Sequence, residues 1–303
     1  MNTHAVLMSA YNDFDILLNN VKILAPCFDC YIHVDRKAEF PPEIRRKLQE
    51  YPNVYVIQKY RITWGSYKHI LAFLELLKMA EPKGSYKHIL AFLELLKMAG
   101  SKGYGWYHLI TGNSVLVRPY KELEAFFMDH DGQIFMNYVD VKASESRKDL
   151  EYWFQYYRYP YLYNQRGKHR RLWENFEWYY IKIQKKLGIK RKVYFDYKGY
   201  LYCQLPDAAA KYVLQYVKEN PRYIHELKYC HVGEEFFFQN ILMHSTFRDK
   251  VINQNLIYDD WSPERERPAF LNEGDYDRIM ESGCFFARKI NASSKGLMEK
   301  IHI

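Results

Sequence analysis

Short apolar runs alternate with amphipathic helical segments along most of this chain, and this alternation constrains its fold more than any single motif. A short apolar run between turn signals is typical of a strand buried on both faces, as strands of parallel sheets are. Strands that alternate with helices favour β-α-β units. The sequence therefore predicts an α/β fold, with a mainly parallel, twisted sheet flanked by helices.

The individual elements follow from apolar periodicity and from their end signals. Asp13 is expected to cap a helix that runs to about Leu24, and Pro41 suits the first turn of a helix that ends near Glu50. The other expected helices are Tyr120–Met128 and Pro206–Glu219, and the expected strands are His4–Ala10, Cys30–Val34, Val54–Gln58, Tyr107–Thr111, Gln133–Asn137 and Leu201–Leu205. Ligands of such sheets bind at the carboxyl ends of the strands, where Asp35, Trp64 and residues 112–114 fall.

An exact internal repeat interrupts this pattern, since residues 65–80 recur without change as residues 84–99. Each copy is an amphipathic helix. Pro82 and Gly84 break helices, so the region 65–102 is expected to form two separate helices. Only one copy can occupy the original position in the fold. The sequence thus predicts a single domain, 1–303, in which one copy of the duplicated helix is dispensable.

Composition limits the class of protein. Hydrophobic residues make up 48% of the chain, and no apolar run approaches the length of a membrane-spanning helix. The first eight residues lack the features of a signal peptide, and five cysteines, an odd number, favour reduced thiols. We therefore expect a cytoplasmic protein. Cys27 and Cys30 have redox spacing, but two thiols in the core explain them more simply.

Positive charge is concentrated in one segment. Residues 165–192 contain ten Lys and Arg and two acidic residues, Glu174 and Glu177. The net charge of this segment is therefore +8, which equals that of the whole chain. Aromatic residues are interleaved with these charges, in a basic aromatic insertion that spans 143–196. This composition suits an anionic membrane surface or single-stranded nucleic acid. The ordinary alternative is a solvated basic helix whose aromatic side chains pack inward.

The last quarter of the chain carries the residues best suited to chemistry. Glu234 and Glu235 open an aromatic helix, Trp261 follows, and Arg288 and Lys289 end a short apolar strand. A carboxylate can act as a base, an aromatic ring can support a sugar, and fixed cations can stabilise a departing anion. Each part alone has an ordinary explanation: charge at a helix start, a core Trp, and a solvated strand end.

Taken in order, six segments resemble one family, the core-2/I-branching β-1,6-N-acetylglucosaminyltransferases, which are related to the peptide xylosyltransferases. The segments are Tyr31–Asp35, Trp64–Ser66, Leu109–Asn113, Glu234–Glu235, Trp261 and Phe286–Lys289. The resemblance covers nearly the whole chain except Ala143–Asp196. It implies a GT-A-like fold, a UDP-sugar donor, inversion at the anomeric carbon and no catalytic metal or other cofactor, in a bacterial-type member.

The resemblance also implies roles on the donor side. Asp35 matches an Asp that binds the uridine, and Lys289, with Arg288 beside it, matches the Lys that contacts the diphosphate. An Arg upstream of that Lys falls at Arg267, with Arg265 as the alternative.

Ser114 stands where the family usually has an Asp, and it is therefore a further candidate for donor binding. Val232 and Gly233 stand where the family often has Ser-Pro. These two departures leave the donor sugar open, with N-acetylglucosamine favoured.

On the acceptor side, Glu235 matches the catalytic base, while Trp261 and Glu234 fall where the acceptor binds. We expect the first turn of the helix to keep Glu235 ionised. The implied acceptor is a glycan hydroxyl, and the basic segment favours a lipid-linked glycan at the inner membrane face.

Three alternatives stay open at this stage. Asp-x-Asp spacings at 13–15, 129–131 and 275–277 could hold a metal, although none follows the strand expected to carry it. The chain could also be an inactive sugar-binding protein, or a membrane or nucleic-acid adaptor that uses residues 165–192. We expect no nucleic-acid partner, because an adaptor would not explain the ordered motifs elsewhere.

Overall fold

The computed structural model of the chain describes residues 4–59, 104–158, 170–227, 229–262, 264–265 and 268–301. Three features predicted from the sequence, the duplicated helix at 65–102, Trp64 and Arg267, lie outside the described residues.

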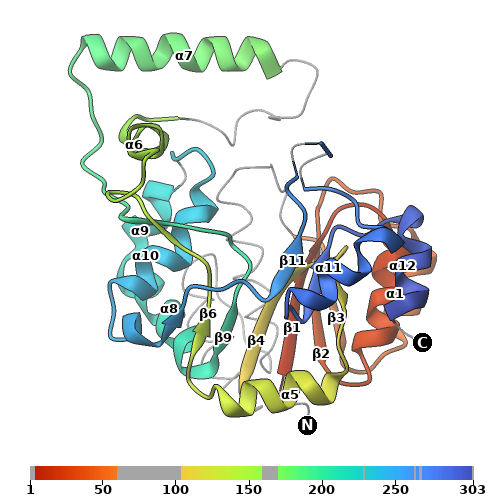
Figure 1. Ribbon diagram of the computed structural model, residues 1–303. Helices are drawn as coiled ribbons and strands as arrows, with labels where there is room; N and C mark the ends of the chain where they lie inside the picture. The colour runs from red at the N-terminus through yellow and green to blue at the C-terminus, as the bar shows by residue number, and fades with distance from the viewer. Residues whose placement is uncertain are drawn as a thin grey trace.

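A seven-stranded sheet forms the centre of the molecule, in the order β10-β6-β9-β4-β1-β2-β3 (Figure 1). All neighbouring pairs are parallel except those of β9, which runs antiparallel to both β4 and β6. The strands are β1 (His4–Ala10), β2 (Asp29–Val34), β3 (Val54–Ile57), β4 (Trp106–Thr111), β6 (Ile134–Phe135), β9 (Gln204–Pro206) and β10 (Val251–Ile252). The predicted α/β fold with a mainly parallel sheet is confirmed.

Helices cover both faces of this sheet because the side chains of each strand alternate between them. Ala5 and Leu7 of β1 pack into one apolar cluster, whereas Val6 and Met8 pack into another. The first cluster is completed by α6 (Arg147–Gln155), α8 (Asp207–Glu219), α9 (Pro221–Leu227) and α10 (Phe237–Met243), and the second by α1 (Phe14–Leu24), α2 (Pro42–Gln49) and α5 (Tyr120–Asp129).

Asp13 precedes α1, as predicted, but its side chain makes no capping hydrogen bond. The reason lies in its backbone, which is left-handed with φ 52°, whereas a capping residue normally has an extended backbone. Pro41 and Pro42 begin α2, in agreement with the predicted helix start. The last predicted strand is shorter than expected and covers only Gln204–Pro206.

Two small sheets lie beside the central one. The first has the order β11-β12-β5 and consists of β11 (Ile257–Asp259), β12 (Phe286–Arg288) and β5 (Val115–Leu116). It holds the chain after β4 against the C-terminal quarter of the molecule. The second pairs β7 (Val139–Asp140) with β8 (Tyr197–Lys198).

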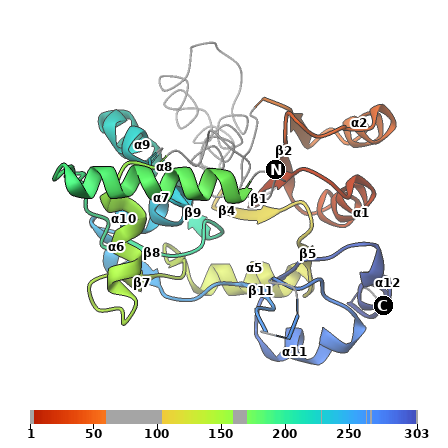
Figure 2. The same ribbon diagram turned by 90° about the horizontal axis from the view of Figure 1, so that it is seen from above.

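The remaining helices are α7 (Arg170–Lys186), α11 (Tyr276–Glu281) and α12 (Lys295–Ile301). The described residues also form short 3-10 helices at η1 (Gly233–Phe236), η2 (Arg248–Lys250), η3 (Glu273–Asp275) and η4 (Ala292–Ser294). Helix α7 lies at the outer edge of the molecule, above α6 in Figure 1 and in front of it in Figure 2. None of the described helices combines the length and the apolar character needed to cross a membrane.

The cysteines are all free thiols. Cys30 is fully buried, and burial raises the pKa of its thiol far above the ordinary range. Cys27 is partly exposed, and burial, together with the nearby charge of Glu124, also raises its pKa. A redox-active thiol needs a lowered pKa, so this pair is better explained as core thiols.

A charged cluster ties β11 to the segment before α11. The buried carboxylates of Asp260 and Asp275 each lie 2.7 Å from Arg265, and Arg278 contacts Asp275 as well. Burial alone would raise the pKa of Asp275, but hydrogen bonds from Arg265 and from the Asn272 N–H outweigh it and hold the pKa below its usual value.

Asp275→Ala should therefore lower the free energy of unfolding in urea by about 2–3 kcal/mol, less than for a fully buried pair because Arg265 reaches solvent. The pKa of Asp275 is lowered by folding, so its contribution is present above the unfolded pKa and is lost as pH falls through the folded value. The deficit should shrink below about pH 4. Asp277→Ala, at an exposed position two residues away, is the matched control, and a pH-independent deficit would contradict this account.

Candidate active site

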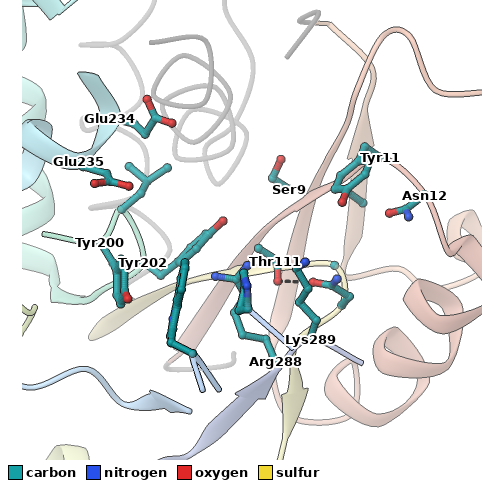
Figure 3. Close-up of a pocket in the computed structure, with 16 residues that line it drawn as sticks. Ser9, Tyr11, Asn12, Thr111, Tyr200, Tyr202, Glu234, Glu235, Arg288 and Lys289 are labelled. Carbon is teal, nitrogen blue, oxygen red and sulfur yellow. Dashed lines mark hydrogen bonds between the residues drawn. The ribbon is translucent and has the colours of Figure 1, made fainter. Parts of the chain in front are cut away.

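A cavity of about 220 Å³ opens at the carboxyl ends of β1 and β4 (Figure 3). Segments that are far apart in sequence meet there: the ends of β1 and β4, the segment before β9, η1, and the residues around the ends of β11 and β12. The lining residues are Ser9, Ala10, Tyr11, Asn12, Thr111, Gly112, Asn113, Tyr200, Leu201, Tyr202, Glu234, Glu235, Trp261, Pro268, Arg288 and Lys289.

The structure brings five of the predicted site residues together in this cavity: Glu234, Glu235, Trp261, Arg288 and Lys289. In Figure 3 the two carboxylates lie on one side of the cavity, and the two cations lie on the other, with Tyr200 and Tyr202 between them. This separation of charge is the main chemical property of the site.

The cationic side comes from the end of β12. Arg288 lies opposite Asp259 in the parallel β11–β12 pair, with 3.8 Å between the guanidinium and the carboxylate, and its guanidinium carbon lies 4.8 Å from the Tyr202 ring centre. Its Nε is buried and makes no hydrogen bond within the described structure. Lys289 is buried too, with its ammonium 5.1 Å from the ring centre of Phe270.

The acidic side comes from η1. A Cβ on Gly233 would lie only 2.4 Å from the carbonyl oxygen of Leu227, so this close approach requires glycine. Glu235 accepts a backbone hydrogen bond of 2.8 Å from Gly199, which joins η1 to the chain after β8. Glu234 and Glu235 lie in the first turn of this short 3-10 helix, and α10 follows directly.

Asn240 of α10 holds the other side of this junction. Its side-chain oxygen accepts hydrogen bonds from the N–H groups of Asp196 and Tyr197, at 2.8 and 3.1 Å. Its amide nitrogen donates to the carbonyls of Tyr197 and Phe236, each at 2.7 Å. One buried amide therefore fixes β8 relative to η1.

This junction also places Lys198, which the sequence did not predict as a site residue, beside Glu235. Its ammonium lies 2.6 Å from the carboxylate of Glu235. Burial raises the pKa of Glu235, Lys198 acts to lower it, and Glu234 adds to the rise. The pKa of Glu235 is therefore raised, whereas the start of a helix was expected to favour the ionised carboxylate. Helix η1 is a single short turn, and burial of the carboxylate outweighs its effect. A carboxylate with a raised pKa accepts a proton more readily.

An aromatic platform lies next to the carboxylates. Trp261 is 45% exposed, and its ring stacks on that of Tyr200 with 6.0 Å between the centres. Burial raises the pKa of the nearby Asp259 carboxylate, whereas the Trp261 indole and the Arg288 guanidinium act to lower it. An exposed indole face that stacks on a second ring is a suitable surface for a sugar ring.

The loop after β4 forms the floor of the cavity. Thr111, Gly112 and Asn113 line it, whereas Ser114 is fully buried. The Ser114 hydroxyl lies 2.8 Å from that of Thr111, and Asn20 donates to the carbonyls of Gly112 and Ser114 at 2.9 Å. Ser114 thus shapes the loop, and the structure does not bring its side chain into the cavity.

Asp35 also lies next to the cavity rather than among its lining residues. Its N–H donates to the carbonyl of Ala10 at 2.8 Å, and its carboxylate accepts from the N–H of Lys37 at 2.9 Å. It is therefore adjacent to the segment Ala10–Asn12 that lines the cavity. Arg265 is engaged by Asp260 and Asp275 and does not line the cavity either.

The residues around the site do not form an obvious metal centre. In the part of the chain that the structure describes, no three His, Cys, Asp or Glu side chains gather to hold an ion. Asp13 and Asp15 begin α1, Asp129 ends α5, and Asp275 belongs to the charged cluster.

Sequence comparison assigns no family to this chain. No protein-family model matches the sequence. No curated protein matches it either.

Comparison with solved structures finds weak similarities. Core-mannan synthase A from Aspergillus fumigatus, in a manganese- and GDP-bound form, aligns over 83% of this chain and 72% of its own, with 13% identity and a TM-score of 0.33. Mouse xyloside xylosyltransferase 1, in apo form, aligns over 96% of this chain and 99% of its own, with 10% identity and a TM-score of 0.37. Residues 1–349 of S. aureus TarS, in complex with UDP-GlcNAc, align over 45% and 34%, with 15% identity and a TM-score of 0.28. At such low values the similarity carries no argument about function, which has to come from the site.

Replacing Lys198 by Met should raise the pKa of Glu235, since the ammonium favours the ionised carboxylate. Carboxyl ¹³C NMR, with Glu235→Gln to assign the signal, would measure it. Lys198→Arg keeps the charge and should leave the titration close to that of the wild type. An unchanged titration in Lys198→Met would show that the ion pair does not set the protonation of Glu235.

Proposed function

We propose that this protein is an inverting glycosyltransferase with a GT-A-like fold, which moves a sugar from a UDP-sugar to a hydroxyl group of a glycan without a catalytic metal. The observation that carries the proposal is the arrangement of the cavity, where Glu235 lies on one side and Arg288 and Lys289 on the other. N-acetylglucosamine is the sugar that the family resemblance favours.

In this mechanism Glu235 is the general base. The acceptor oxygen attacks the anomeric carbon from the side opposite the diphosphate, and its proton passes to the Glu235 carboxylate. The bond between the anomeric carbon and the phosphate oxygen breaks, and UDP leaves with the electron pair. A single displacement of this kind inverts the configuration at the anomeric carbon. Lys198 holds the carboxylate in position without itself exchanging the proton.

The departing diphosphate gains negative charge, which Arg288 and Lys289 would stabilise. Both are fixed before the substrate arrives, Arg288 by Asp259 and Tyr202, and Lys289 by burial beside Phe270. We propose that Arg267 assists them and that Asp35 contacts the uridine. In the loop after β4, Thr111 and Asn113 would contact the donor, as was expected of Ser114.

The acceptor would bind on the other side of the anomeric carbon. Trp261 offers an exposed ring for stacking, and Glu234 lies next to the base, where it can accept a hydrogen bond from a second hydroxyl. We place this reaction in the cytoplasm, with the acceptor glycan carried on a lipid.

Glu235→Gln should keep the affinity for the UDP-sugar but lower turnover by about a hundredfold or more, as loss of a general base does. The rate of UDP release, measured with a panel of UDP-sugars and acceptors, tests this directly. Glu299→Gln, at an exposed carboxylate of α12, is the matched control and should leave the rate unchanged.

Near-normal turnover in Glu235→Gln would remove Glu235 from the role of base. A wild-type protein that binds UDP-sugars but releases no UDP would instead be an inactive sugar-binding protein.

A further inference from the structure

Helix α7 is attached to the molecule along one face. Gln184 exchanges hydrogen bonds of 2.9 and 3.0 Å with the backbone of Tyr157, and Glu177 forms an ion pair of 2.9 Å with Arg158. Ile181 is buried on the same face. At about 100° per residue, Glu177, Ile181 and Gln184 fall within about 60° of the helix circumference. This inner face fixes the orientation of the helix.

The opposite face carries an apolar stripe. Leu172, Phe176, Tyr179 and Ile183 also fall within about 60° of each other, on the side away from the inner face. Their exposed fractions are 69%, 60%, 61% and 55%, and Leu187, just beyond the helix, continues the stripe at 66%. A helix whose outer face is apolar is unusual on a soluble protein, and such a surface marks an interaction site.

Basic residues border this outer stripe. Lys182 and Lys186 follow one of its edges, and the Lys182 ammonium lies 3.4 Å from the ring centre of Trp178. In total α7 contains five basic and two acidic residues. Lys185 lies against Tyr152 of α6, whereas Lys182 and Lys186 present their charge on the same side of α7 as the apolar stripe.

These features together distinguish between possible partners. Leu172, Ile183 and Leu187 are aliphatic, so they cannot stack on bases as a surface for single-stranded nucleic acid would require. A second copy of α7 would bring like charges together. A membrane with anionic lipids accepts both groups, the apolar side chains in its hydrocarbon boundary and the cations among its phosphates.

We propose that α7 is a membrane-docking helix that lies in the plane of a bilayer containing anionic phospholipid. Leu172, Phe176, Tyr179 and Ile183 enter the boundary between headgroups and acyl chains, and Lys182 and Lys186 contact the lipid phosphates. The docking itself does not depend on the proposed function.

Its consequence for catalysis does rest on the proposed function. Helix α7 lies beyond the carboxyl ends of the central strands in Figure 1, on the same side as the cavity. The two are connected by contacts through α6, because the Lys185 ammonium lies 4.9 Å from the Tyr152 ring and the Lys198 ammonium 5.0 Å from the Trp153 ring. Docking through α7 would thus turn the catalytic side toward the bilayer, where a lipid-linked acceptor would be held.

Flotation of the full chain with vesicles tests the docking, using phosphatidylcholine alone or mixed with phosphatidylglycerol at low and high salt. The wild type should bind the mixed vesicles and should lose binding as salt increases. Lys182→Gln/Lys186→Gln should weaken binding about 25-fold, since each surface cation contributes about fivefold. Phe176→Ser/Ile183→Ser should weaken it at least as much, which a purely electrostatic contact would not predict.

The control is Met128→Ser, an exposed apolar residue of α5 at the other end of the molecule in Figure 1, which should bind as the wild type does. Unchanged circular dichroism would show that each variant is folded. Equal binding to neutral and mixed vesicles, no binding to either, or normal binding by the stripe variant would overturn the proposal.

Concentration-dependent self-association without vesicle binding would assign the stripe to a second copy, and preferential binding of a single-stranded oligonucleotide would assign α7 to nucleic acid. UDP release with a soluble acceptor is measured separately, so failure of docking and failure of the proposed function are distinguishable.

Discussion

A carboxylate that is largely removed from water must be held by a cation or by donors, and this requirement organises one side of the cavity. Lys198 meets it for Glu235 at 2.6 Å, and the two residues come from elements that are not neighbours in the sequence. They meet because the Gly199 N–H donates to the backbone carbonyl of Glu235 and because Asn240 joins β8 to η1.

The other side of the cavity depends on a separate sheet. Strand β12 pairs with β11 on one side and with β5 on the other, so Arg288 and Lys289 emerge beside the loop that follows β4. The cations and the carboxylates are therefore positioned by independent parts of the fold. Each charge is partly compensated by its own partner, Asp259 for Arg288 and Lys198 for Glu235, which allows both to remain near one cavity.

The elements that could be predicted from the sequence are those whose residues carry a local pattern. The buried strands β1, β2 and β4 are apolar runs, and the carboxylates of η1 and the cations of β12 stand at element ends, where a motif marks them. Lys198, Tyr200 and Tyr202 could not be found in this way, because they follow a segment without a recognisable pattern. Only tertiary contacts bring the two tyrosines into the cavity and Lys198 to Glu235. Ser114 was misleading for a related reason, since its position in the chain does not reveal that its hydroxyl turns inward to Thr111.

The basic segment 165–192 was also predictable only in part. Its charge was visible in the composition, and the spacing of Leu172, Phe176, Tyr179 and Ile183 could have revealed an apolar stripe. Which face would be covered was not predictable, because it depends on the contacts of Glu177 and Gln184 with residues 157–158. The structure also shows that Arg191 is buried against Glu226, so part of the positive charge is structural.

The central claim is that protein cations, in place of a metal, bind the diphosphate. Titration calorimetry of UDP in the presence of EDTA tests it most directly, on the wild type, on Lys289→Ala and on Lys295→Ala as an exposed control. The account predicts that the wild type and the control bind UDP alike, and that Lys289→Ala binds at least about tenfold more weakly, since a charge-assisted bond is lost. Binding that disappears in EDTA and returns with manganese, or full affinity in Lys289→Ala, would contradict it.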